Sequence, residues 1–280
     1  MRIIRLVVIA SIAFINWHSN LDAQVTTNVD ILKEAAIKQA ALESKTYKEL
    51  MKLALEKKWP VTIQGKSGKY AVLTGVDFQG YPMYTTTDNN TRSAATIGTS
   101  KLWPGGNTGL NLSGSGNAVK GKLGIWDGGK LRNTNLEFGN RITQRDNAST
   151  LTDHGTHVTG TLIASGVNPV AKGMAFGIQE LIAYDFNNHL SEMLTEAPNL
   201  LVSNHSYGSI AGWRFNDTDN RWEFWGQAGT TEDYKFGYYS SDTQMWDSIA
   251  YNGPFYLIVK SVGNNRNENG PAVGENYWRF

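Results

Sequence analysis

The chain has 280 residues, 40% of them hydrophobic, which is enough to bury one large core or two smaller ones. Its formal net charge of +1 gives no electrostatic reason to expect nucleic acid or an anionic membrane as a partner. Because it contains no cysteine, disulfides, iron–sulfur clusters and a cysteine nucleophile are excluded.

Residues 1–23 have the order of charged, apolar and small residues that is typical of a secretory signal peptide. Arg2 and Arg5 precede the apolar run 6–15, and Ala23 stands at a suitable cleavage position. The apolar run is too short to cross a bilayer core of ~30 Å as a permanent helix. We therefore expect a secreted or periplasmic protein that begins near Gln24 and makes no membrane contact after signal removal.

Residues 24–95 predict a small α+β region. Apolar residues recur at spacings of three and four from Asn28, which can cap a helix, to Lys58, where Trp59-Pro60 ends it. Short β-like runs separated by glycines follow at 61–63, 70–73 and 81–87. Residues 87–100 are polar and small, as in a linker.

From residue 121 onward, predicted strands alternate with predicted helices. This alternation predicts an α/β fold with a mainly parallel sheet flanked by helices. Asp127, Ser206 and Asn264 each follow a predicted strand, and sites in such sheets form at the carboxyl ends of strands. We expect these residues and His154 to surround one cleft. The predicted strands are 123–125, 181–184, 200–203 and 256–262, and the predicted helices are 156–165, 191–197 and 242–251.

Residues 210–240 are unusually rich in aromatic side chains. Trp213 and Phe215 precede the turn-forming run 216–220, and Trp222 and Phe224 follow it, a pattern that predicts a hairpin. Such aromatic density could form a sugar- or protein-binding face, but we expect a small local core that closes a long loop.

The stretch Asp153-His154-Gly155-Thr156-His157-Val158-Thr159-Gly160 places a histidine at the start of a predicted helix, with Asp153 or Thr152 as its cap. Gly155 and Gly160 would allow another backbone or a substrate to approach closely. His154 is thus a candidate general base, although a histidine beside an apolar helical face can also be purely structural. The two histidines are three residues apart rather than four, and Gly155 stands where a zinc-protease glutamate would be, so we expect no metal site.

Four blocks in this order resemble the subtilisin-like serine peptidases, the subtilases: 122–129 around Asp127, 153–160, 203–208 and 257–265. The resemblance runs from about Lys120 to Asn265. It implies that Asp127 orients the base, that His154 is the base, and that Asn264 donates to the oxyanion. It also implies that Ser206, Tyr207 and Gly208 form a strand that pairs with an extended peptide or protein substrate. His157 matches a structural companion that we expect to be buried and hydrogen-bonded.

By the same resemblance, residues 24–95 occupy the place of a propeptide; a permanent accessory domain is the alternative. We expect a monomer that needs no cofactor for its chemistry. Structural calcium is compatible with the sequence but is not indicated by it. Two departures stand out. Gly128 occupies a position where the family commonly has Ser or Thr, and no Gly-Thr-Ser-x-Ala block follows Asn264 before Phe280.

Two other serines cannot easily replace that block. Gly98-Thr99-Ser100 precedes Asp127, in the wrong chain order, and Ser206 is not in a Gly-x-Ser-x-Gly elbow. We therefore interpret residues 96–280 as the N-terminal part of an exported serine endopeptidase, incomplete at the C-terminus and inactive alone because its nucleophile is missing. The alternative is a non-catalytic peptide- or glycan-binding protein on the same scaffold.

Overall fold

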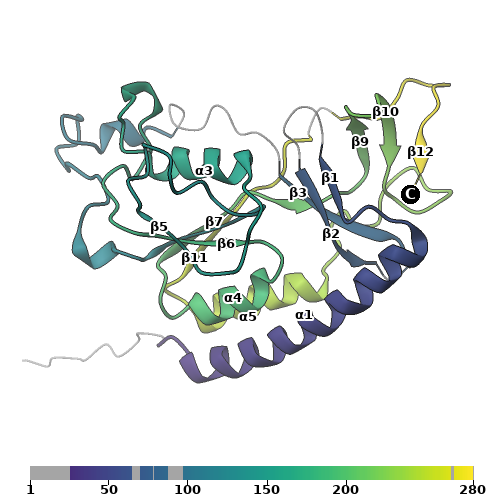
Figure 1. The fold of residues 1–280 in the computed structure, drawn as a ribbon, viewed down its shortest axis with the longest axis horizontal. Helices are drawn as coiled ribbons and strands as arrows, with labels where there is room; N and C mark the ends of the chain where they lie inside the picture. The colour runs from purple at the N-terminus through teal and green to yellow at the C-terminus, as the bar shows by residue number, and fades with distance from the viewer. Residues whose placement is uncertain (1–25, 65–69, 78, 88–96, 266–267, 280) are drawn as a thin grey trace, which may run out of the picture.

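The computed structural model describes residues 26–64, 70–77, 79–87, 97–265 and 268–279. The predicted signal peptide and most of the predicted linker lie outside the described residues. The α/β fold class is confirmed: a five-stranded parallel sheet has helices on both faces, and an N-terminal helix with an antiparallel sheet lies beside it (Figure 1). None of the helices within the described ranges is both long and apolar enough to cross a membrane.

The five-stranded sheet has the strand order β11-β7-β4-β6-β5, and each neighbouring pair is parallel. Every residue of β4 is buried because both faces of the sheet are covered. Successive side chains point to opposite faces, so Ile125 packs on the α3 side with Val158, whereas Trp126 packs on the α4 and α5 side with Leu194. The strands are β4 (Leu123–Asp127), β5 (Ile142–Gln144), β6 (Leu181–Asp185), β7 (Val202–His205) and β11 (Leu257–Lys260), and the helices are α3 (Asp153–Ile163), α4 (His189–Glu196) and α5 (Ser241–Asn252).

The predicted strands and helices of this part are present, with ends displaced by up to three residues. The strand predicted at 200–203 begins at Val202, and the helix predicted at 156–165 begins at Asp153. Strand β5 was not predicted, because its three residues include a single buried apolar side chain, that of Ile142. Three short 3₁₀ helices complete this part: η1 (Thr99–Lys101), η2 (Asn117–Val119) and η3 (Pro169–Ala171).

The N-terminal region has the predicted helix followed by three strands. Asn28 stands at the N-cap position, but its side chain makes no capping hydrogen bond, so the predicted cap is wrong in this detail. The helix ends at Lys58, whose φ of 57° is left-handed, directly before Trp59-Pro60 as predicted. The elements are α1 (Val29–Lys57), β1 (Thr62–Gln64), β2 (Tyr70–Val76) and β3 (Pro82–Thr87), and β8 (Gly208–Ser209) adds to this sheet beside β3.

The aromatic-rich segment forms the predicted hairpin. Its strands β9 (Trp213–Asn216) and β10 (Arg221–Phe224) are antiparallel, and Asn220 in the connecting turn has a positive φ of 50°. Strand β12 (Trp278–Arg279) pairs in parallel with β10. In Figure 1 this three-stranded sheet lies next to the β1–β3 sheet, and α1 passes beneath the latter and beneath α4 and α5.

Candidate active site

Asp127 and His154 form a buried hydrogen-bonded pair at the carboxyl end of the parallel sheet. Asp127 is the last residue of β4, and His154 is the second residue of α3. Nδ1 of His154 lies 2.8 Å from Oδ1 of Asp127, and both side chains are almost inaccessible to solvent. If Nδ1 carries the proton and donates it to the carboxylate, Nε2 is the basic nitrogen, which is the tautomer that a general base requires.

The turn that follows β4 holds the carboxylate of Asp127 in place. The backbone N–H of Gly128 donates to Oδ1 at 2.8 Å, so the backbone supplies a hydrogen bond although residue 128 has no hydroxyl. Gly129 has a φ of 73°, and a Cβ there would lie 2.6 Å from the carbonyl oxygen of Thr150. The hydroxyl of Thr152 donates to the carbonyl oxygen of Gly128 and ties this turn to the start of α3.

Gly155 is the residue that lets α3 approach β4. A Cβ at this position would lie 3.2 Å from both Cβ and Oδ1 of Asp127 and 2.8 Å from a methyl group of Leu131. The predicted close approach is therefore confirmed at Gly155. At Gly160, none of the described residues outside its own helix turn lies within 4 Å of a Cβ placed there, so the close approach expected at that position stays a prediction.

Burial dominates the electrostatics of the aspartate. It raises the pKa of Asp127 above its usual range, while the hydrogen bonds from His154 and the Gly128 N–H act in the opposite direction. The second carboxylate oxygen, Oδ2, is buried and has no hydrogen-bond partner within the described part of the chain. The ionised form of Asp127 thus depends on donors to Oδ1, chiefly the His154 ring.

Two expectations about the first turn of α3 are wrong. Thr152 stands at the N-cap position without a capping side-chain hydrogen bond, because its hydroxyl donates to Gly128, and Asp153 is already inside the helix. His157, which we expected to be buried, is exposed. The buried side of α3 is centred on Gly155, Val158 and Thr159, and at about 100° per residue position 157 points away from that centre.

The block 206–208 lies directly after β7. Its middle residue, Tyr207, turns its ring into the core, where its hydroxyl lies 2.9 Å from Nδ1 of His205. Ser206 Oγ accepts from Asn204 Nδ2 at 2.9 Å. Gly208 is in β8 and pairs with Thr86 of β3, so the strand expected to pair with a substrate pairs here with the N-terminal region.

Asn264 lies four residues after Lys260, the last residue of β11, and is exposed. Gly263 before it has a φ of 92°, which a glycine adopts readily. His205 of β7 is in register with Trp126 of β4 and with Lys260 of β11. The segments that lead to Asp127, Ser206 and Asn264 therefore leave the sheet at the same end, the carboxyl end of its strands. No hydrogen bond between Asn264 and His154 is present among the described residues.

Trp126, the residue before Asp127, is held by a stack that sequence reasoning missed. Its ring lies between Tyr184, with centroids 4.9 Å apart, and His205, with centroids 5.1 Å apart. Its Nε1–H donates to Glu192 at 2.9 Å. Burial and the nearby carboxylates raise the pKa of Glu192 to about 8. The alternation of Trp126 and Asp127 along a buried strand was the available signal for this second layer.

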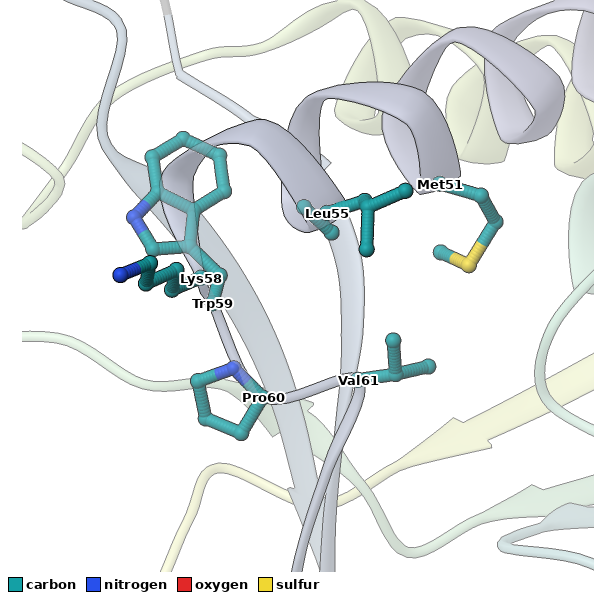
Figure 2. Close-up of a pocket in the computed structure, with 7 residues that line it drawn as sticks. Met51, Leu55, Lys58, Trp59, Pro60 and Val61 are labelled. Atoms are coloured by element: carbon teal, nitrogen blue, oxygen red, sulfur yellow. The ribbon is translucent and has the colours of Figure 1, made fainter.

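A separate hollow lies away from the Asp127–His154 pair. Figure 2 shows Met51, Leu55 and Val61 around a shallow space of about 560 Å³ where α1 meets β1. Its lining contains a single titratable group, that of Lys58, so it offers no acid–base pair. Among the described residues, no group of three or more His, Asp and Glu side chains is arranged to hold a metal ion.

Comparison with known proteins assigns the sequence to a family. The model of the subtilase family matches residues 106–278, which include Asp127, His154, block 206–208 and Asn264. No curated protein and no solved structure matches the chain significantly. Since the family model covers more than half of the sequence, the chain belongs to the subtilase family of serine peptidases.

Proposed function

We propose that this chain carries the histidine base and the orienting aspartate of an exported subtilisin-like serine endopeptidase. The observation that carries the proposal is the 2.8 Å contact between His154 Nδ1 and Asp127 Oδ1 at the carboxyl end of a parallel sheet. In that arrangement His154 removes a proton from a serine hydroxyl and later gives it to the leaving amine, and Asp127 stabilises the imidazolium that forms in between.

The nucleophilic serine is proposed to come from sequence outside these 280 residues. Ser206 accepts a hydrogen bond from Asn204 and lies in the segment proposed to bind substrate backbone. With a base but no hydroxyl to activate, residues 1–280 alone are expected to show no more than background hydrolysis, because such a triad acts as a unit. Asn264 is proposed as the oxyanion donor.

Residues 24–95 are proposed to act as a propeptide. Two observations support this role: β3 pairs antiparallel with Gly208 and Ser209, and α1 packs on α4 and α5. A strand in that position would exclude an extended peptide from the same edge. The substrate of the released enzyme would be peptide or protein, bound by a monomer without a cofactor in the chemistry.

The test uses a fluorophosphonate probe, which labels activated serines. The 280-residue chain and a form extended through a Gly-Thr-Ser-x-Ala segment of the source reading frame are treated side by side. Labelling only of the extended form, lost in His154→Ala and kept in the matched His157→Ala variant, supports the proposal. Labelling of the 280-residue chain at Ser100 or Ser206 would contradict it. An extended form that binds peptide but takes no label would favour the non-catalytic binding protein.

A further inference from the structure

The aromatic-rich segment packs against the N-terminal region, although about 120 residues separate them in the sequence. The rings of Tyr84 in β3 and Trp225 after β10 meet edge to face, with centroids 5.4 Å apart. Both side chains are buried, with 1% and 5% of their surface exposed. They belong to one apolar cluster with residues from α1, β2 and the segment before β9: Leu50, Ala54, Ala71, Leu73 and Ile210.

Hydrogen bonds fix the same two parts to each other. The N–H of Ile210 donates to the carbonyl oxygen of Tyr84 at 2.8 Å and extends the β3–β8 pairing. In addition, the hydroxyl of Tyr234 donates to Asp77 Oδ2 at 2.7 Å. The aromatic-rich segment is therefore not the self-contained local core that its sequence predicts, because its buried side is completed by residues of the N-terminal region.

A buried aspartate, Asp233, fixes the conformation of the aromatic-rich segment next to Trp225. Asp233 is 1% exposed, accepts from the N–H of Gly212 at 2.7 Å and pairs with Lys235 at 2.9 Å. The ammonium of Lys235 also donates to the carbonyl oxygen of Trp225 at 2.6 Å. The position of the Trp225 backbone is thus set by charge-assisted hydrogen bonds within the segment, which makes the docking surface pre-organised.

This surface is separate from the contact that α1 makes with α4 and α5. The latter involves the first half of α1, where Leu32 and Ala36 share a core with Leu194 and Ile249. Leu50 belongs to the Tyr84–Trp225 cluster. At 1.5 Å per residue, Leu32 and Leu50 are roughly 27 Å apart along one rigid helix. Two sites joined by a stiff element reinforce each other, because binding at one holds the other at high local concentration.

We propose that residues 210–239 are a dedicated docking surface for the N-terminal region formed by α1 and β1–β3, additional to the β3–β8 pairing and the α1 contacts, and that this surface sets how slowly that region leaves once the chain between the two is cut. The cut itself rests on the proposed propeptide role. The partner is the chain's own N-terminal region, recognised by its Tyr84 face and by Asp77. Release would expose the apolar side chains of Leu73 and Tyr84 on one part and Ile210 and Trp225 on the other, so dissociation is expected to be slow. Retention does not depend on whether Asp127 and His154 are catalytic.

The experiment places a recognition sequence for a site-specific protease between Asn89 and Asn90 of the full chain. After complete cutting, the two parts are expected to co-elute in size-exclusion chromatography. An excess of labelled N-terminal part is then added, and the rate at which it replaces the bound unlabelled part gives the release rate. Trp225→Ala is expected to accelerate release about a hundredfold or more, since it empties the centre of the shared core. Tyr234→Phe, which removes one hydrogen bond and no ring, is expected to accelerate it about two- to tenfold.

The matched control is Trp222→Ala in the same hairpin. Trp222 packs on Phe215 of the neighbouring strand, with centroids 5.3 Å apart, and is not part of the Tyr84–Trp225 cluster in the described part of the chain. Its release rate is expected to equal that of the unmodified cut protein. Circular dichroism of each uncut variant checks folding, and Tyr234→Phe keeps the test valid should Trp225→Ala fail to fold. Rapid separation of the unmodified cut protein, or equal release rates for Tyr234→Phe and the control, would overturn the proposal.

Discussion

Gly155 lies so close to Asp127 that a methyl group on its Cα would be 3.2 Å from Oδ1 of the carboxylate. The closeness of these two residues allows α3 to deliver His154 to the end of β4. A side chain at position 155 would push the helix away from the strand and lengthen the Asp127–His154 contact.

Gly155→Ala is therefore expected to destabilise the protein by about 1–3 kcal/mol, as overpacking of a close contact does. The measurement is urea unfolding followed by circular dichroism. Gly160→Ala is the control in the same helix. Because its methyl group meets none of the described residues within 4 Å, it is expected to stabilise the protein by up to about 1 kcal/mol. Equal effects of the two substitutions would contradict the steric role of Gly155.

His157 and His154 are expected to behave differently despite sharing one motif. His157 is exposed, so His157→Ala should change the free energy of unfolding by no more than about 0.5 kcal/mol. His154→Ala removes the partner of a buried carboxylate and is expected to cost about 3–5 kcal/mol at neutral pH. Thermal unfolding of both variants compares them. A large loss in His157→Ala would show that this side chain has a structural role after all.

Arg141 is expected to be irreplaceable by lysine. Its guanidinium donates to five backbone carbonyl oxygens at 2.7–3.1 Å, including that of Ile163, the last residue of α3. An ammonium has three donors and no planar fork, so Arg141→Lys leaves several of these carbonyls unpaired. We expect a loss of about 2–4 kcal/mol in urea unfolding. A change below 1 kcal/mol would mean that water replaces the guanidinium at these carbonyls.

Glu192 is expected to make stability fall as pH rises. Its pKa is raised from 4.5 to about 8 by burial, so the folded protein holds a proton that the unfolded chain has lost between these values. Stability is fully present below about pH 4.5 and declines toward pH 8, with an upper bound of about 5 kcal/mol. Glu192→Gln keeps an acceptor for Trp126 and should flatten the profile between pH 5 and 8. The contrary result is an unchanged slope in chemical unfolding.

The exported form is expected to begin near Gln24, because Ala23 ends a stretch with the pattern of a signal peptide. N-terminal sequencing of protein recovered from the medium or periplasm checks this. An intact Met1 on exported material would remove the signal-peptide interpretation and the proposed localisation with it.

The sequence by itself determined the elements whose signals are local. The apolar run ending at Asp127, the helix beginning beside His154 and the hairpin around residues 216–220 each follow from residue spacing and turn chemistry within a few neighbours. The α/β class followed from their alternation. Short signals failed. Strand β5 has too few apolar residues to stand out, and the expected cap at Thr152 is absent because its hydroxyl donates to Gly128 instead.

Only the tertiary structure decided which distant groups meet. The contact of Asp127 with His154 spans 27 positions, and the different surroundings of Gly155 and Gly160 depend on how closely α3 approaches β4. Likewise, the sequence of the aromatic-rich segment does not predict that Trp225 packs on Tyr84. Local residue spacing determines which side of a helix or strand is apolar. Because the hydrophobic effect is non-directional, it does not specify what that side packs against, and the close packing of the whole chain decides this.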